Sequence, residues 1–242
     1  MVSVDYEARD GIARVHLNRP ERLNAVTTEL TEGLLAALDR AAADGARAVV
    51  LAGRGRAFCS GHDLKEPVPV ETAIETRRRV DRLQEVTRRI RAFPGVVIAA
   101  VHGYAVGAGC EFALCCDLIV ADEHAQFGFP EVGLGLSVTG GISALLPKIV
   151  GLAAAKEMLL LGERFAAAKA AELGLINRVV PAGEHEKAAL EWAATVAARP
   201  PVAVSLAKQV LNQGMDGGMA EALATEADHA VLTSVVGEYG HG

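Results

Sequence analysis

The feature that most restricts the fold of this chain is a set of short apolar segments separated by amphipathic ones. Residues 48–52, 96–101 and 117–121 are rich in valine, isoleucine and alanine, and their length is that of buried strands. Residues 27–43 and 72–92 repeat apolar side chains every three or four positions, which predicts helices. Strands that alternate with helices predict an α/β protein with a parallel sheet, whose ligands usually bind beyond the carboxyl ends of the strands.

Both ends of the chain add to this pattern. Residues 2–8 and 12–17 alternate polar and apolar side chains around Asp10-Gly11, a dipeptide that favours a hairpin turn. Further segments are predicted as follows: helices at residues 111–115, 152–161, 166–173, 184–198, 201–212 and 219–236, a last short strand at 176–180, and a mobile loop at 65–70. We therefore predict a core of residues 1–183, followed by a helical region of residues 184–242 that serves as a cap or an assembly surface.

Length, charge and cysteine content exclude several classes of protein. At 242 residues the chain can bury a large core without disulfides. Its net charge of −6 argues against a general nucleic-acid surface, and the arginines of residues 77–91 fit a solvated helix face. The four cysteines form no CxxC pair and have no histidine at zinc-ligand spacing, so we expect reduced core residues and no bound metal.

The same features indicate a cytoplasmic protein. Cysteines that stay reduced are typical of that compartment. The first ten residues contain neither a basic leader nor an apolar export segment. No apolar run reaches the about 18 residues that a membrane span requires, so we expect no membrane partner.

Two glutamates carry the strongest indication of chemistry. Glu111 closes a run with glycines at positions 103, 107 and 109, and Glu131 follows it by twenty residues, directly after Pro130. Two carboxylates near one carbon framework can divide the work of general acid and general base. Glycine-rich turns expose main-chain N–H groups, which can stabilise a developing negative charge. Together these features predict an enzyme that forms and protonates an enolate.

Two main-chain amides are candidates for holding that charge. If a helix begins just after the glycine run, the N–H of Ala108 lies at its N-terminus, where the helix dipole is positive. The N–H of His62 can supply a second donor, because Gly61 before it has no side chain. Such a pair forms an oxyanion hole, in which one donor contributes about 10²–10³ in rate.

Other chemistries fit these residues less well. The run 107–112 lacks the third glycine of a dinucleotide fingerprint, and no phosphate-binding GxxxxGK[ST] loop occurs. Residues 135–140 have their second glycine one position too late for a nucleophile elbow. Ser60 beside His62 suggests a hydrolase, but residues two apart rarely face each other and no acidic partner stands out.

In this order and spacing, the segments resemble the crotonase family, the enoyl-CoA hydratase/isomerase superfamily. The resemblance covers most of residues 10–182 and rests on residues 17–20, 23–26, 57–66, 99–120, 125–131 and 170–181. It implies a crotonase-like spiral of ββα units with a helical C-terminal trimerisation region. The chain would then assemble as a homotrimer or, as a dimer of trimers, a homohexamer.

The resemblance also implies the roles of particular residues. His62 and Ala108 would supply the oxyanion hole, while Glu111 and Glu131 match the two catalytic carboxylates, including their separation of twenty. The residues that match the substrate-binding segments are Arg22, Leu23 and Ala25 at the CoA nucleotide and His62, Asp63, Leu64 and Lys65 at the thioester and pantetheine. No separate cofactor is implied, since coenzyme A arrives as part of an acyl-CoA substrate.

The implied activity is that of an enoyl-CoA hydratase of fatty-acid β-oxidation, which adds water across the C2=C3 bond of a 2-enoyl-CoA. An enoyl-CoA isomerase, a decarboxylase, a thioester hydrolase and a catalytically silent CoA-binding protein remain alternatives. Residues 132–143 differ from the proline-glycine turn and the Gly-Gly-Thr-Gln-Arg-Leu stretch typical of hydratases, and His62 stands where a small residue is commoner. The acyl group is therefore left open.

Overall fold

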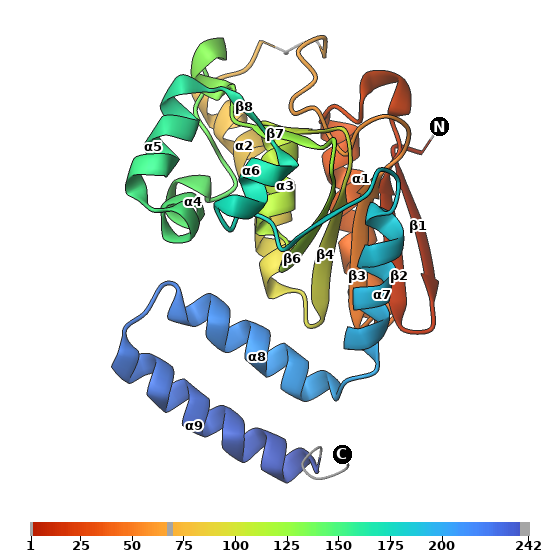
Figure 1. Ribbon diagram of the computed structural model, residues 1–242, viewed down its shortest axis with the longest axis vertical. Coiled ribbons are helices and arrows are strands. Elements are labelled where there is room, and N and C mark those ends of the chain that lie inside the picture. The colour runs from red at the N-terminus through yellow and green to blue at the C-terminus, as the bar shows by residue number, and fades with distance from the viewer. Residues whose placement is uncertain (1, 67–69, 238–242) are drawn as a thin grey trace.

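The computed structural model describes residues 2–66 and 70–237 and shows an α/β fold (Figure 1). The N-terminal elements are β1 (Val4–Arg9), β2 (Ile12–Leu17), the 3-10 helix η1 (Pro20–Arg22), α1 (Thr28–Ala43), β3 (Ala48–Gly53), α2 (Ala73–Ala92) and β4 (Val96–Val101). The middle elements are β5 (Tyr104–Val106), α3 (Ala108–Cys115), β6 (Leu118–Asp122), β7 (Gln126–Gly128) and the 3-10 helix η2 (Glu131–Leu134). The C-terminal elements are α4 (Ile142–Val150), α5 (Leu152–Leu161), β8 (Arg164–Ala166), α6 (Ala167–Glu172), β9 (Arg178–Val180), α7 (His185–Ala197), α8 (Pro201–Gly214) and α9 (Met219–Val236).

The main sheet has six strands in the order β1-β2-β3-β4-β6-β9. β1 and β2 are antiparallel and turn at Asp10 and Gly11, whose φ angles of 51° and 75° are those of a tight hairpin. The strands from β2 to β9 are parallel. The predicted hairpin and parallel sheet are confirmed, and the carboxyl ends of β3, β4 and β6 lie at one edge of the sheet.

Side chains of the central strands alternate between two apolar layers. Val49 and Leu51 of β3 pack with α1, α2 and α3, whereas Val50 between them packs with α7 on the opposite face. Ala189 and Ala193 of α7 are fully buried there, and their small size lets the helix lie close to the strands. Helices therefore cover both faces of the sheet (Figure 1), which explains why its strands read as continuous apolar runs.

A second, smaller sheet lies next to the main one and is absent from the sequence-based expectation. β5 pairs in parallel with β7, and β7 pairs antiparallel with β8. Each of these strands has three residues, which is too short to leave a recognisable periodic pattern. The small sheet matters for function because β5 leads into α3 and β7 leads towards Glu131.

Two further expectations need correction. The helix expected at residues 111–115 begins at Ala108, because Gly107, with a φ of 56°, already acts as its N-cap. α4 was not expected, since Pro147 within it and the paired glycines before it argue locally against a helix. The loop expected at residues 65–70 falls in part outside the described residues.

The C-terminal helices form two groups. α7 packs on β3, β4 and β6, whereas α8 and α9 pair with each other, and α8 also contacts β4 (Figure 1). No described residue of α9 is buried. The division of the chain between residues 183 and 184, and the assembly role of the helices beyond it, stay predictions.

One buried ion pair fastens α8 to the sheet. Lys208 Nζ lies 2.8 Å from Asp117 Oδ2, and it donates hydrogen bonds to the carbonyl oxygens of Ile90 at 2.8 Å and Gly95 at 3.1 Å. Asp117 Oδ2 also accepts the N–H of Val97 at 2.7 Å. Burial raises the pKa of the Asp117 carboxyl, and the Lys208 cation opposes that rise. This side chain therefore joins α8 to the end of α2 and the start of β4.

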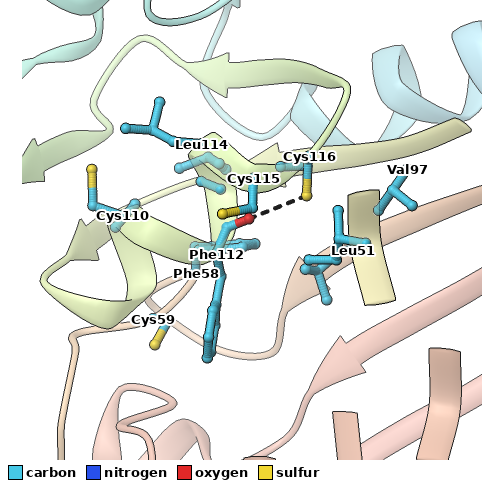
Figure 2. Packing of buried hydrophobic residues seen from close by; sticks show 14 of the residues in the cluster. Leu51, Phe58, Cys59, Val97, Cys110, Phe112, Leu114, Cys115 and Cys116 are labelled. Atoms are coloured by element: carbon cyan, nitrogen blue, oxygen red, sulfur yellow. Dashed lines mark hydrogen bonds between the residues drawn. The ribbon is translucent and has the colours of Figure 1, made fainter. Parts of the chain in front are cut away.

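The four cysteines lie within the apolar core. Figure 2 shows their side chains among Phe58, Phe112 and Leu114, with the Cys116 thiol donating to the carbonyl oxygen of Phe112 at 3.3 Å. All four are free, and burial raises the pKa of the Cys59 thiol to about 12. The expectation that they are unpaired core residues is confirmed.

Replacing Lys208 by methionine is expected to lower the free energy of unfolding by about 3–5 kcal/mol, because Asp117 would remain buried without a cation. Urea unfolding measures this change. Lys169→Met breaks an exposed pair with Glu172 and is the matched control, with an expected change below about 1 kcal/mol. Equal effects in the two variants would contradict the role assigned to the buried pair.

Candidate active site

The site is built around a contact between two glycines beyond the carboxyl ends of β3 and β4. Cys59 and Ala105 form a parallel bridge that brings the two segments together. Gly61 and Gly107 follow, with φ angles of 89° and 56°. A Cβ on Gly107 would lie 3.6 Å from the Cα of Gly61, and a Cβ on Gly61 would lie 2.8 Å from the carbonyl oxygen of Val106. The close approach, together with the positive φ angles, therefore requires glycine.

The amide that follows each glycine is unpaired. Ala108 is the first residue of α3, so its N–H has no partner within the helix. Around His62, the N–H of Val26 donates to Gly61 at 2.8 Å and the N–H of Asp63 donates to Val26 at 3.0 Å, which leaves the His62 amide out of this bridge. Within residues 2–66 and 70–237, neither the His62 nor the Ala108 N–H has an acceptor. Two adjacent free amides are what an oxyanion hole requires.

A left-handed turn at Leu23 and Asn24 is hydrogen-bonded to the segment that precedes His62. Leu23 and Asn24 have φ angles of 51° and 55°, and the carbonyl oxygen of Leu23 accepts the N–H of Ser60 at 3.1 Å. The fully buried Asn24 amide donates to the carbonyl oxygens of Arg54 at 2.9 Å and Ala57 at 2.7 Å. Asparagine tolerates a positive φ better than most residues do. The turn therefore holds the loop between β3 and Gly61 in place.

Glu111 lies in the first turn of α3 and is 3% exposed. Its Oε1 accepts the N–H of Thr139 at 2.7 Å, and its Oε2 accepts the Thr139 hydroxyl at 2.6 Å. Burial raises the pKa of the Glu111 carboxyl, and the two bonds from Thr139 oppose that rise. Glu111 is thus a buried carboxyl group with one donor on each oxygen.

Glu131 opens η2 and is 8% exposed. Its Oε1 lies 3.1 Å from the position that a Cβ on Gly107 would take. Its Oε2 is buried and has no hydrogen-bond partner among the described residues. Burial raises the pKa of the Glu131 carboxyl, a bond to its own N–H opposes the rise, and the charge of Glu111 adds to it. The two predicted carboxylates are therefore brought into one buried environment beside Gly107.

The residues matched to the CoA edge differ in exposure. Leu64, at 69%, and Lys65 are exposed, whereas Ala25 is buried and Leu23 is half-buried. The His62 side chain is also exposed, but partial removal of its ring from water lowers the pKa of the imidazole, and the nearby Arg79 cation lowers it further. The role of these side chains in binding CoA stays a prediction.

Asp63 and Arg22, both matched to substrate binding, are paired with each other. Arg22 donates to Asp63 Oδ1 at 2.6 Å, and Arg19 donates to Asp63 Oδ2 at 3.0 Å. These bonds, that of Arg22 above all, lower the pKa of the Asp63 carboxyl to about 2. The trio fastens the turn at residues 19–25 to the segment that follows His62.

Thr139 and Asn24 have functions in the site that the sequence analysis does not assign. Asn24 lies inside a segment that carries the resemblance, but its partners lie about thirty positions away, and only the tertiary fold reveals them. Thr139 precedes two glycines, which indicates a turn. Its contact with Glu111, 28 positions away, leaves no local signal.

Comparisons with known proteins show the family of this chain. The family described as enoyl-CoA hydratase/isomerase matches residues 7–238. A relative from Thermus thermophilus, provisionally named an enoyl-CoA hydratase, is 41% identical over 214 residues, which cover 86% of this chain and 84% of the relative. A short-chain-enoyl-CoA hydratase from Clostridium acetobutylicum is 36% identical, with 93% of this chain and 87% of that protein covered. The crystal structure of an enoyl-CoA hydratase from Bacillus anthracis aligns with a TM-score of 0.89 at 32% identity, over 94% of this chain and 89% of that one.

The α/β fold, with paired amides and carboxylates at one edge of its sheet, defines a crotonase-type protein. The match extends over nearly the whole chain, from the first hairpin to the last helix. The chain belongs to the enoyl-CoA hydratase/isomerase family.

The described residues contain neither a membrane-spanning helix nor a cluster of metal-ligating side chains. No helix in residues 2–66 and 70–237 is long and apolar enough to cross a membrane. In the same part of the chain, no group of three or more histidine, cysteine, aspartate or glutamate side chains is arranged to hold a metal ion.

Asp63→Asn is expected to destabilise the protein at neutral pH and much less in acid. The folded pKa of about 2 lies below the unfolded value of about 3.9, so the ionised carboxylate stabilises the fold above about pH 4. This contribution is lost as the pH falls through about 2. Urea unfolding of both proteins between about pH 5 and pH 2 should therefore show a shrinking difference in free energy. Asp10→Asn, in an exposed pair with Arg9, is the control, and a constant difference for Asp63→Asn would contradict the prediction.

Proposed function

We propose that this chain is an enoyl-CoA hydratase, which adds water across the C2=C3 bond of a 2-enoyl-CoA thioester to give 3-hydroxyacyl-CoA. The observation that carries the proposal is the placement of two buried carboxyl groups, Glu111 and Glu131, beside the unpaired amides of His62 and Ala108. Hydration requires a base for the water and an acid for carbon, and this pair can supply both. The hydratases among the relatives support the same assignment.

The chemistry follows from these four groups. The thioester oxygen accepts hydrogen bonds from the His62 and Ala108 amides, which draws electron density away from C3. Ionised Glu111 takes a proton from water while the water oxygen forms a bond to C3. The C2=C3 electron pair moves to form an enolate, whose negative oxygen the two amides stabilise.

Protonated Glu131 completes the addition. It transfers its proton to C2 as the thioester carbonyl re-forms, so the product has gained one water. The proton now on Glu111 must return to Glu131, directly or through solvent, before the next turnover. No metal or separate cofactor takes part in this scheme.

An enoyl-CoA isomerase is the second candidate. The unpaired Oε2 of Glu131 favours it, because one carboxylate free of hydrogen bonds can carry a proton between two carbons of the acyl chain. Incubation with a 3-enoyl-CoA distinguishes the two: a hydratase leaves it unconjugated, whereas an isomerase forms the conjugated product. Release of free thiol would instead indicate a hydrolase, and loss of carbon dioxide from a carboxyacyl-CoA would indicate a decarboxylase.

The acyl group is proposed to be an uncharged aliphatic chain. Residues 132–143, which follow Glu131, contain no charged side chain. Val132, Leu134 and Leu136 are between 45% and 50% exposed, so an apolar surface is available next to the carboxyl pair. A panel of enoyl-CoA thioesters of varied length, branching and charge tests this assignment, and preference for an acyl chain with a terminal carboxylate would contradict it.

We also propose a cytoplasmic homotrimer or dimer of trimers, joined through residues 184–242. Within α9, Leu223, Val231 and Leu232 are exposed, and apolar side chains gathered on one helix are typical of an interface. Light scattering of the purified protein tests this proposal, and a monomer at micromolar concentration would refute it.

Glu111→Gln and Glu131→Gln are each expected to lower kcat by about 10²–10⁴-fold, since each removes a group that transfers a proton. Loss of the conjugated-thioester absorbance measures turnover, and titration with a saturated acyl-CoA measures binding. Binding should be retained. Glu191→Gln, on the outside of α7, is the matched control with unchanged turnover. Normal turnover in either of the first two variants would rule out the mechanism.

The pH profile of kcat/KM is expected to be bell-shaped. Burial raises the pKa values of both carboxyl groups towards neutral pH, and their charges interact. Activity should rise as Glu111 loses its proton and fall again as Glu131 loses its own. A profile that stays flat from about pH 5 to pH 9 would show that these groups do not control the reaction.

A further inference from the structure

We propose that Thr139 is a positioning residue that selects Glu111, rather than Glu131, as the ionised member of the carboxyl pair. This inference deepens the proposed hydratase function and rests on it. Hydration as described above requires the two glutamates to differ in protonation before substrate binds. The structure points to the hydrogen bonds from Thr139 as the cause of that difference.

The contact between Thr139 and Glu111 favours an ionised carboxylate. The main-chain N–H donates to Oε1 at 2.7 Å and the hydroxyl donates to Oε2 at 2.6 Å, so each oxygen receives one donor. The second distance is typical of a charge-assisted O–H···O⁻ bond. A proton on Oε1 would compete with the fixed main-chain N–H, and a proton on Oε2 would replace the bond that the Thr139 hydroxyl donates. Thr139 therefore stabilises the charged form of Glu111.

Glu131 has the opposite surroundings. Its Oε2 is buried and no described side chain or amide donates to it, and the only donor to this carboxyl among the described residues is the N–H of Glu131 itself. An ionised oxygen that is buried without a donor is strongly disfavoured. When Glu111 is charged, its neighbour is therefore the group that keeps a proton.

Thr139 is itself held firmly against Glu111. The carbonyl oxygen of Gly140 accepts the Thr87 hydroxyl at 3.2 Å and the Cys115 thiol at 3.4 Å, which fastens this loop to α2 and α3. A Cβ on Gly140, whose φ is 59°, would lie 3.2 Å from the Cβ of Glu111 and 3.2 Å from its Oε2, so Gly140 lies directly against the Glu111 side chain. The donors of Thr139 therefore remain in position as the charge on Glu111 changes.

The arrangement leaves Glu111 able to act on water. An ionised carboxylate has about four acceptor positions, and Thr139 occupies one on each oxygen. The positions that remain can receive a water molecule while the carboxylate is prevented from rotating. Thr139 thus sets the direction of proton flow: from water to Glu111, and from Glu131 to C2.

Two substitutions separate the effect of the Thr139 hydroxyl from the effect of the side chain's shape. Thr139→Val removes the hydroxyl but keeps the branched shape and the main-chain N–H, whereas Thr139→Ser keeps the hydroxyl and loses only a methyl group. Thr195→Val, at an exposed position of α7, is the matched control. The ionisation of Glu111 is followed by ¹³C NMR of carboxyl-labelled protein, with Glu111→Gln identifying its signal, and the pH profile of kcat/KM is measured in parallel.

In Thr139→Val, the Glu111 signal and the acid limb of the pH profile should both move to higher pH by about one unit, because the charged form has lost a donor. Thr139→Ser and Thr195→Val should titrate like the wild type. An unshifted Glu111 signal in Thr139→Val would overturn the inference, and so would a shift of the same size in Thr139→Ser. The NMR titration needs no turnover, so absence of hydration would refute the proposed function while the Thr139 inference is judged on the Glu111 signal alone.

Discussion

The contact between Gly61 and Gly107 is the constraint on which the rest of the site depends. Two loops that follow neighbouring parallel strands meet there with positive φ angles and no side chain between them. The amides of His62 and Ala108 come next in each loop, and Glu131 rests against Gly107. A side chain at either glycine would push apart the groups that we propose to act on the same thioester. The sheet register, through the bridge of Cys59 to Ala105, sets how the two loops meet.

Burial of two acidic groups is the second feature, and it has an energetic cost. A carboxylate removed from water needs donors, and the protein supplies them to Glu111 through Thr139 while withholding them from one oxygen of Glu131. Local instability of this kind is typical of catalytic sites, where a group must change its charge readily. The surrounding structure compensates, since Asn24, Arg19 and Asp63 hold the loop near His62 through hydrogen bonds.

Much of the fold can be read from the sequence because the main strands and helices have strong local patterns. β3, β4 and β6 are continuous apolar runs, and α1, α2 and α9 repeat apolar side chains at the helical period. In these elements the local sequence preference agrees with the packing in the fold. The small sheet of β5, β7 and β8 could not be found this way, because it depends on pairing between segments far apart in the chain. The start of α3 was misplaced because a glycine N-cap gives no side-chain signal.

In the site, too, features with a local sequence pattern can be predicted, whereas tertiary contacts cannot. Glu111, Glu131 and the two glycine turns can be identified from spacing and from the family resemblance, since these residues are close to their turns in the sequence. The residues that hydrogen-bond to these groups cannot be identified from the sequence in the same way. Thr139 reaches Glu111 through a tertiary contact, and Asp63 meets Arg22 across the loop from an earlier turn.

The most direct measurement is the infrared spectrum of a bound 2-enoyl-CoA labelled with ¹³C at the thioester carbonyl. A variant carrying both Glu111→Gln and Glu131→Gln would hold the substrate without turning it over. If the amides of His62 and Ala108 converge on the carbonyl oxygen, the C=O stretch should move to lower wavenumber than that of the same thioester free in water. An unchanged stretch, in a complex shown to be saturated, would contradict the oxyanion hole and with it the enolate mechanism.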